Sequence, residues 1–440
     1  MSLVRKGLIA IIGTTGVGKS QLAVDIARAV DGEVINADAL QVYAGYDIIT
    51  NKVSSGEAQG VAHHLLGVVP AHREYTVQEF ERDALKKIAE IHQRNRVPIL
   101  VGGTNYYIQS TMFGKSLIRQ APQGTGRQFE AAHQNKTNQE LWQELRQKDP
   151  VMAENWHPNN RRKVLRSLEV LQTTGKRHSE WIKDTEQARE REETLRFPTL
   201  LLWLYADSEQ LIPRLDARVD TMVSRGMFGE IEQLACDISD PQVLGGVAAN
   251  DFSVGLKQAI GFREFQPYLQ AVAAGDASTE TLENLKAAGI ENMKIATRQY
   301  AKRQIAWIRN KTLPECKTTL KKRQQAQAFV LDATDLAQWN TDVRDRGIQL
   351  AKSFICGGEL PSAKLLSARA AALLADVKDP GSMLAWKKHH CRVCSTDEVQ
   401  VWLNGEDEYR QHMRSRRHRR NELCERKSRQ AEQAADSARV

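Results

Sequence analysis

The sequence lacks the features of membrane and secreted proteins. None of its apolar stretches reaches the roughly 18 residues that a spanning helix needs, although 41% of the 440 residues are hydrophobic. The opening MSLVRK leads directly into an apolar segment, which leaves no room for a secretory or transit peptide. We therefore expect a cytosolic protein without membrane contact. Alternative start sites that would send it to mitochondria or the nucleus stay open.

Cysteine is also scarce, with six residues in the chain. Four are scattered, at Cys236, Cys316, Cys356 and Cys424, whereas Cys391 and Cys394 form a C-x-x-C pair. This usage excludes a disulfide framework and favours reduced thiols plus one metal clip.

No internal repeat is evident. Because 440 residues exceed the roughly 250 to 300 that one core supports, we expect a main domain with smaller additions.

Charge of one sign is in excess, with 62 Lys and Arg against 54 Asp and Glu, a net charge of +8. The balance suits a polyanionic partner. Basic residues crowd the stretch from Arg410 to Arg429. This stretch is either a solvated helical face or a surface that contacts phosphates.

Short apolar runs alternate with amphipathic stretches over much of the chain. The strand candidates are Gly7 to Ile12, Glu33 to Asn36, Pro98 to Val101 and Leu200 to Tyr205. Most are joined by helical patterns and followed by polar or glycine-rich turns, which predicts an α/β fold with a parallel sheet. A polar, helical stretch interrupts the alternation. We expect a core of residues 1–119 and 198–330, a helical insertion at 120–197, a connector at 331–384 and a C-terminal module at 385–440.

A complete G-x-x-x-x-G-K-S motif follows the first strand candidate and precedes a helix pattern, as a P-loop requires. Its residues are Gly13, Thr14, Thr15, Gly16, Val17, Gly18, Lys19 and Ser20. Converging backbone amides and the helix N-terminus attract an anion, Lys19 adds a charge, and the Ser20 hydroxyl suits Mg²⁺. The motif predicts phosphate binding but does not say which phosphate compound is bound.

Two further polar groups follow strand candidates. Asp38 ends the second strand, and Thr104 lies in the VGGTNYY segment after the third. The carboxyl ends of parallel strands border the ligand crevice, so both residues are expected beside the P-loop. Asp38 is either a catalytic base or a helix-capping turn residue.

Several motifs in order resemble the tRNA dimethylallyltransferases, also called tRNA isopentenyltransferases. The N-terminal ones are GTTGVGKS, DALQVY, HHLL and GGTNYYIQ. The later ones are NNRRKVLRSLEV, RLDARVDTMVSRG, QAIGFREF and ATRQYAKRQIAWIRN, which ends at Asn310. The pattern is most similar to the eukaryotic branch with a C-terminal zinc finger. Ala39 and Ala62 depart from the residues usual in the family, without touching a residue assigned to chemistry.

The resemblance implies transfer of a dimethylallyl group from dimethylallyl diphosphate to N6 of adenosine 37 in tRNA, with diphosphate as leaving group. Asp38 would accept the amino proton as the new bond forms. The P-loop, Ser20 with Mg²⁺, Thr104 and Arg218 would stabilise the charge on the diphosphate. A surface ion pair is the alternative role of Arg218.

The resemblance also implies contacts with the anticodon stem-loop, whose target base must be extruded to react. Asp38, Ala39, Leu40 and Gln41 would line the RNA side of a channel. In the insertion, the candidates for RNA contact are Asn160, Arg161, Arg162, Lys163, Val164 and Arg166. Arg298, Lys302 and Arg303 form a basic helical pattern that suits RNA, diphosphate or solvent. A monomer that binds one tRNA is the simplest expectation.

Cys391 and Cys394 are followed by His412 and His418, which five residues separate. Two thiolates and two imidazoles suit a structural Zn²⁺, and the His-x5-His end resembles matrin or U1-type fingers. His389 and His390 are alternative ligands nearby. The finger would contact the tRNA backbone, bind protein or serve as a structural cap.

Three other functions share part of this pattern. A P-loop small-molecule kinase would need a nucleotide-base pocket and lid, and would not need a finger suited to RNA. An adenylate isopentenyltransferase, which alkylates free AMP, ADP or ATP, shares the P-loop and Asp38 but not the long C-terminal part. An RNA-binding protein with a degenerate P-loop is disfavoured because Lys19, Ser20 and Asp38 are all present.

Overall fold

The computed structural model describes residues 6–71, 73–114, 125–191, 195–239, 255–323, 326–375, 377, 388–396 and 401–437. The chain divides into two units. One comprises Met1–Leu117 and Glu193–Pro380, and the other comprises Ile118–Glu192 and Gly381–Val440. Across the described ranges, no helix combines the length and the apolar character needed to cross a membrane.

A six-stranded parallel sheet forms the centre of the first unit, in the order β3-β2-β4-β1-β5-β6. Its strands are β1 (Leu8–Gly13), β2 (Gly32–Asn36), β3 (His63–His64), β4 (Val97–Val101), β5 (Thr199–Tyr205) and β6 (Ala326–Asp332). The expected parallel α/β fold is confirmed. The two edge strands β3 and β6 are additional to the strands predicted from the sequence.

Both faces of the sheet are buried under helices. Successive side chains of β1 belong alternately to two apolar clusters, so that Ala10 lies in one and Ile11 in the other. The first cluster packs under α3 (Val77–Gln93) and α4 (Asn105–Met112), and the second under α1 (Lys19–Val30) and α16 (Arg346–Cys356). Burial on both sides explains why the central strands are continuous apolar runs.

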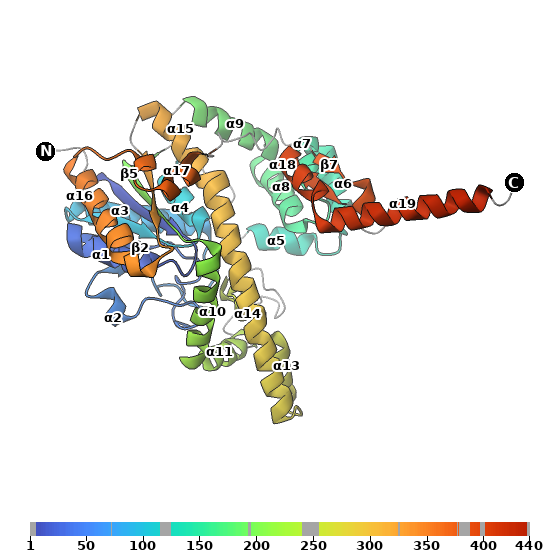
Figure 1. Cartoon of the computed structure of the whole chain (residues 1–440), viewed down its shortest axis with the longest axis horizontal. Coiled ribbons are helices and arrows are strands. Elements are labelled where there is room, and N and C mark those ends of the chain that lie inside the picture. The colour runs from blue at the N-terminus through green and yellow to red at the C-terminus, as the bar shows by residue number, and fades with distance from the viewer. Residues whose placement is uncertain are drawn as a thin grey trace. The chain divides into compact units, whose positions relative to one another are not determined.

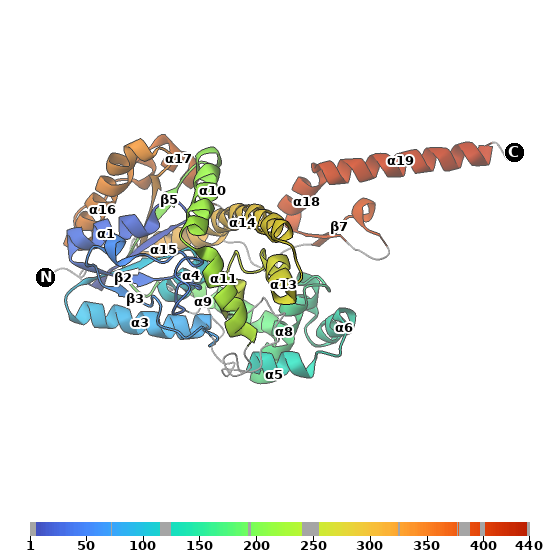
Figure 2. The ribbon, with the colours of Figure 1, turned by 90° about the horizontal axis from the view of Figure 1, so that it is seen from below.

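Together with α16, the other helices that follow β5 complete this unit. They are α10 (Ser208–Ser224), α11 (Met227–Ser239), α13 (Gln266–Ala274), α14 (Thr279–Trp307), α15 (Leu313–Arg323) and α17 (Ala368–Ala375). The 29-residue α14 packs along α10, as Figures 1 and 2 both show. It continues into a π-helical turn, η3 (Ile308–Thr312). This long helix brings a distant part of the sequence to the carboxyl edge of the sheet.

Much of the expected connector at 331–384 packs on the sheet unit. Strand β6 ends inside it at Asp332, and α16 packs on α1 with Gly347 close to Leu22. The first unit extends to Pro380. The core boundary drawn at residue 330 from the sequence therefore differs from the division seen in the structure.

In residues 125–191, the part of the insertion that the structure describes without a gap, five helices follow one another: α5 (Thr125–Ala132), α6 (Asn138–Lys148), α7 (Pro150–Asn155), α8 (Arg161–Thr174) and α9 (His178–Arg191). They enclose a separate apolar cluster that includes Leu141, Leu145 and Leu168. A capping box between Thr137 and Glu140 starts α6. The insertion thus has a core of its own.

The described C-terminal residues form a small module. Strands β7 (Lys388–His390) and β8 (Trp402–Asn404) pair antiparallel, and α18 (Gly405–Met413) and α19 (Arg416–Ser437) follow. Its buried apolar cluster consists of Cys391, Cys394 and Leu403. So small a core gives little hydrophobic stabilisation, which points to another source of stability.

Candidate active site and metal centre

The P-loop motif forms the turn between β1 and α1. Gly18 caps α1 at φ +86°, a left-handed conformation that favours glycine. No side chain caps this N-terminus, and the first helical turn carries no acidic residue. The first amides of α1 therefore have no side-chain acceptor at the cap, in the arrangement that binds phosphate.

Two cations and one carboxylate interact at this helix end. The Lys19 Nζ donates to the Thr14 carbonyl oxygen at 2.6 Å. Burial and the charge of Arg218 lower the pKa of Lys19 to about 7, against the opposing effect of Asp38. Burial also lowers the pKa of Arg218, which lies on α10. The crowding of Lys19 and Arg218 makes this a place where an anion would be stabilised.

Asp38 follows β2 in a fixed turn. Its Oδ1 accepts from the Leu40 amide at 3.0 Å, and its own amide donates to the Asn36 Oδ1 at 3.3 Å. The other carboxylate oxygen, Oδ2, lies toward Gly103. One oxygen thus orients the side chain while the other is directed toward the cleft, as a proton acceptor would need to be.

Thr104 joins the ends of β2 and β4. Its Oγ1 accepts from the Ala39 amide at 2.9 Å, and its amide donates to the Ala37 carbonyl at 3.2 Å. This close approach requires Gly102, because a methyl group there would overlap the Ala37 carbonyl oxygen. The structure therefore brings Asp38 and Thr104 together beside the P-loop, where the sequence predicts them.

The structure adds two residues that the sequence did not single out. Gln304, on α14, accepts from the Thr15 amide and donates to the Gly103 carbonyl, both at 2.9 Å. Tyr300, one turn earlier, donates to the Gly103 carbonyl at 3.3 Å. Burial and the Asp38 charge raise the pKa of Tyr300, whereas its bond to Thr104 lowers it. The ATRQYAKRQ segment thus contributes uncharged side chains to the site.

A cleft of about 70 Å³ lies between these groups, lined among others by Lys19, Asp38, Arg218 and Gln304. Gln41 also lines it, with both amide hydrogens donated to the carbonyls of Thr50 and Asn51. Its side-chain oxygen is therefore the group with which it would contact a base.

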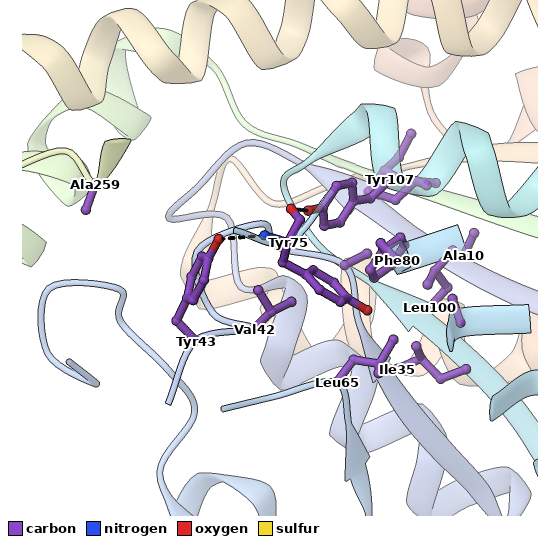
Figure 3. Packing of buried hydrophobic residues seen from close by; sticks show 14 of the residues in the cluster. Ala10, Ile35, Val42, Tyr43, Leu65, Tyr75, Phe80, Leu100, Tyr107 and Ala259 are labelled. Carbon is purple, nitrogen blue, oxygen red and sulfur yellow. Dashed lines mark hydrogen bonds between the residues drawn. The ribbon is translucent and has the colours of Figure 1, made fainter. Parts of the chain in front are cut away.

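Apolar packing supports the loops around the cleft (Figure 3). The Tyr75 amide donates to the Tyr43 hydroxyl, and the Tyr107 hydroxyl donates to the Tyr75 carbonyl, both at 3.3 Å. Tyr107 stacks on Phe80 with the ring centroids 4.0 Å apart. The DALQVY and GGTNYY segments are thereby anchored to the same buried cluster.

The candidate RNA residues of the insertion have different environments. Val164 is fully buried in the insertion core, so its side chain packs there and does not reach RNA. The Arg161 guanidinium donates to the carbonyls of His133 and Lys136. Arg166 pairs with Glu169 at 2.7 Å.

The other three candidates of this segment are exposed. They are Asn160, Arg162 and Lys163, and the Lys163 Nζ lies 4.4 Å from the centroid of the Trp156 ring. The Asn160 side chain caps α8 by accepting from the Lys163 amide. Arg162 and Lys163 are thus the members of the set best placed to contact an RNA backbone.

Four ligand groups converge in the C-terminal module. The ligand atoms of Cys391, Cys394, His412 and His418 lie within 4.8 Å of one another. The His418 Nδ1 is 3.3 Å and 3.5 Å from the two sulfurs and 3.2 Å from the His412 Nε2. Around a tetrahedral zinc ion, with Zn–S about 2.3 Å and Zn–N about 2.0 Å, a sulfur and a nitrogen ligand lie about 3.6 Å apart and two nitrogen ligands about 3.3 Å apart. The donor set fits such an ion.

The two alternative histidines lie outside this cluster. His389 stacks on Tyr409 with the ring centroids 4.6 Å apart, and His390 packs on Trp402 at 4.7 Å. The His390 Nε2 also lies 3.0 Å from the Ser395 hydroxyl. Neither ring belongs to the group of four ligand residues.

Comparisons with known proteins agree with this arrangement. The family model for IPP transferases matches residues 41–311. The tRNA dimethylallyltransferase of Saccharomyces cerevisiae is 37% identical over 430 residues, which cover 97% of this chain and 94% of the yeast protein. The chain belongs to the tRNA dimethylallyltransferase family. The expected resemblance is confirmed.

Two further members of the tRNA dimethylallyltransferase family extend the likeness. The human enzyme is 34% identical over 422 residues, covering 93% of this chain and 85% of the human one. A crystal structure of a eukaryotic dimethylallyltransferase acting on tRNA superimposes with a TM-score of 0.77 at 36% identity, covering 98% and 99% of the two chains. The whole chain, beyond the span of the family model, thus resembles eukaryotic members.

Proposed function

We propose that this chain transfers the dimethylallyl group of dimethylallyl diphosphate to N6 of adenosine 37 in tRNA and releases diphosphate. The observation that carries the proposal is the cleft in which the Asp38 carboxylate faces Lys19 and Arg218 beside the uncapped end of α1. The family relatives are named for this reaction and indicate the two substrates.

The chemistry follows from the positions of these charges. The diphosphate lies at the P-loop, held by backbone amides, Lys19 and Arg218. As the bond between the allylic carbon and oxygen breaks, negative charge grows on the diphosphate, where the two cations stabilise it. The N6 amino group forms the new N–C bond and its proton passes to the Asp38 Oδ2. Tyr300 and Gln304 hold the Gly103 loop in place beside Asp38.

Magnesium fits the same site. Ser20 is exposed in the first turn of α1 and offers a hydroxyl oxygen, a ligand type that Mg²⁺ accepts alongside phosphate oxygens. When bound, the ion would neutralise part of the diphosphate charge. We assign Ser20 as its protein ligand.

Zinc is the metal that we assign to Cys391, Cys394, His412 and His418, because two thiolates with two imidazoles in tetrahedral spacing suit it. The basic helix α19, which carries His418, supports backbone contact with tRNA. Arg162 and Lys163 would grip the anticodon stem-loop from the insertion.

We further propose a monomer that binds one tRNA. We keep the cytosol as the proposed compartment, because scattered cysteines and a single C-x-x-C pair suit reduced thiols and one metal clip.

The test is transfer of radiolabelled dimethylallyl diphosphate to three acceptors: unmodified tRNA with adenosine at 37, the same tRNA with guanosine there, and free AMP. We expect label in the first acceptor alone. Label in AMP would assign the chain to the nucleotide-alkylating enzymes, and label in none would leave phosphate binding without this transfer.

A further inference from the structure

Two large aromatic side chains are exposed next to the candidate active site. Tyr106 is 43% exposed and Trp307 is 37% exposed, with the ring centroids 6.1 Å apart in an edge-to-face arrangement. Tyr106 follows the active-site residue Thr104 by two positions, and Trp307 follows Gln304 by three. The pair therefore lies within about one helical turn of residues that shape the cleft.

A hydrogen bond orients one ring of the pair. The Trp307 Nε1 donates to the Gln109 Oε1 at 2.9 Å, which fixes the indole against α4. The helix α14 changes to the π-helical turn η3 directly after Trp307, and such turns occur frequently at functional sites. A ring held in one orientation loses little entropy when a flat partner stacks on it.

The charges beside the pair favour a polyanion. Lys302, Arg303 and Arg309 are exposed on the same turns of α14 and η3. The Arg303 guanidinium lies 5.9 Å from the centroid of the Tyr300 ring, whose hydroxyl reaches the Gly103 loop. A planar cation and two aromatic rings thus extend outward from the cleft. Single-stranded nucleic acids are bound by such combinations of stacking rings and basic side chains.

We propose that Tyr106, Trp307 and Arg303 form a stacking surface for an unpaired base of the RNA, next to the adenosine that enters the cleft. This proposal rests on the proposed tRNA substrate and deepens it. An extruded nucleotide leaves its neighbours without one stacking partner, and the exposed rings would replace that partner. The surface would then help to position the target adenosine without distinguishing the identity of the base that stacks on it.

The test uses the full chain and an anticodon stem-loop RNA that carries the fluorescent base 2-aminopurine at position 36 or at position 38. We expect the wild-type protein to quench one of the two RNAs on binding. Trp307→Leu keeps an apolar side chain but removes the ring, and should abolish this quenching and weaken RNA binding roughly 5- to 100-fold. Trp307→Phe should retain most of both effects, and Tyr106→Leu should weaken binding in the same direction.

Ile295→Ala is the matched control, because Ile295 is 46% exposed on the same helix, about 18 Å away along its axis. It should bind RNA as the wild type does. Binding of dimethylallyl diphosphate, measured by calorimetry in the absence of RNA, should be the same in Trp307→Leu and the wild type. The proposal would be overturned if Trp307→Leu bound RNA and quenched its fluorescence as the wild type does. It would also be overturned if Trp307→Leu lost affinity for dimethylallyl diphosphate by the same factor as for RNA. Because binding is measured without donor, failure of the alkylation reaction would be detected separately.

Discussion

The phosphate cleft and the C-terminal metal cluster both gather charged or ionisable groups, but different forces hold them in place. The cleft is built at the edge of a sheet whose two faces are covered by extensive apolar clusters. In the C-terminal module, the buried apolar cluster consists of Cys391, Cys394 and Leu403, and two of these three residues are themselves proposed metal ligands. The comparison indicates that the cleft is shaped by the fold before any ligand arrives, whereas we expect the small module to depend on the proposed zinc ion.

Metal removal should separate the two regions most strongly. Structural zinc contributes about 10–16 kcal/mol to the folding of small finger modules, so a chelator should unfold the C-terminal module. Hydrogen exchange should show loss of amide protection in α18 while β1 and β5 keep theirs. Cys394→Ser should reproduce the loss without chelator. Simultaneous loss of protection in β1 would show that the distinction is wrong.

Asp38→Asn should change the chemistry of the cleft without changing its shape. The side-chain oxygen of the variant can still accept from the Leu40 amide, but a carboxamide cannot take up the N6 proton. We expect kcat to fall about 100- to 10,000-fold with donor affinity nearly unchanged, measured by single-turnover transfer and by equilibrium binding. If Asp38→Asn kept the wild-type kcat, Asp38 would not be the proton acceptor of the reaction.

The pH dependence of donor binding tests the electrostatics of the cleft. The pKa of Lys19 is about 7 in the free protein, and a bound diphosphate should raise it toward the ordinary value of about 10.4. Binding then takes up a proton above pH 7, so affinity is highest below pH 7. It should fall by up to about tenfold per pH unit above it. Calorimetry in buffers of different ionisation enthalpy measures this uptake.

Lys19→Arg is the matched variant for the pH test, because arginine stays charged over the whole range. Its donor affinity should be flat between about pH 7 and 10, apart from changes that the wild type shares. A wild-type affinity that is equally flat would contradict the depressed pKa of Lys19.

Gln304→Met should show how far polar bonds complete the preformed cleft. Methionine has a similar size but leaves the Thr15 amide and the Gly103 carbonyl without this partner. We expect the free energy of unfolding of the sheet unit to fall by about 1–3 kcal/mol, measured by urea denaturation. The exposed Gln299 on the same helix is the control, and Gln299→Met should be nearly neutral. Equal stability of both variants would mean that packing alone shapes the loop.

Motifs with a local mechanism could be predicted from the sequence. The P-loop lies between β1 and α1 as expected, and Asp38 and Thr104 lie at neighbouring strand ends. These predictions succeed because the motifs define their own backbone context. The edge strand β6 was not predicted, since an edge strand in a region of mixed composition has a weak local pattern.

Residues that act through long-range contacts were harder to predict. Gln304 lies in a segment whose basic residues suggested a charged surface, yet it continues the buried stripe of Met293, Thr297 and Ala301 on α14. A buried amide cannot be assigned until its partners, 201 and 289 positions away, are known. Val164 illustrates the converse, because an apolar residue in a basic segment belongs to the core.

Gly102 and Gly103 have a consequence for the pattern of natural variation. A methyl group at Gly102 would overlap the Ala37 carbonyl oxygen, and one at Gly103 would overlap the Gln304 amide nitrogen. Neither glycine carries a group that reacts, yet a larger residue at Gly102 would push the backbone of β4 away from the strand end that bears Asp38, whereas one at Gly103 would displace the Gln304 side chain. In a population of variants, Gly102 should therefore be as intolerant of change as the proposed catalytic carboxylate, and Gly103 less so.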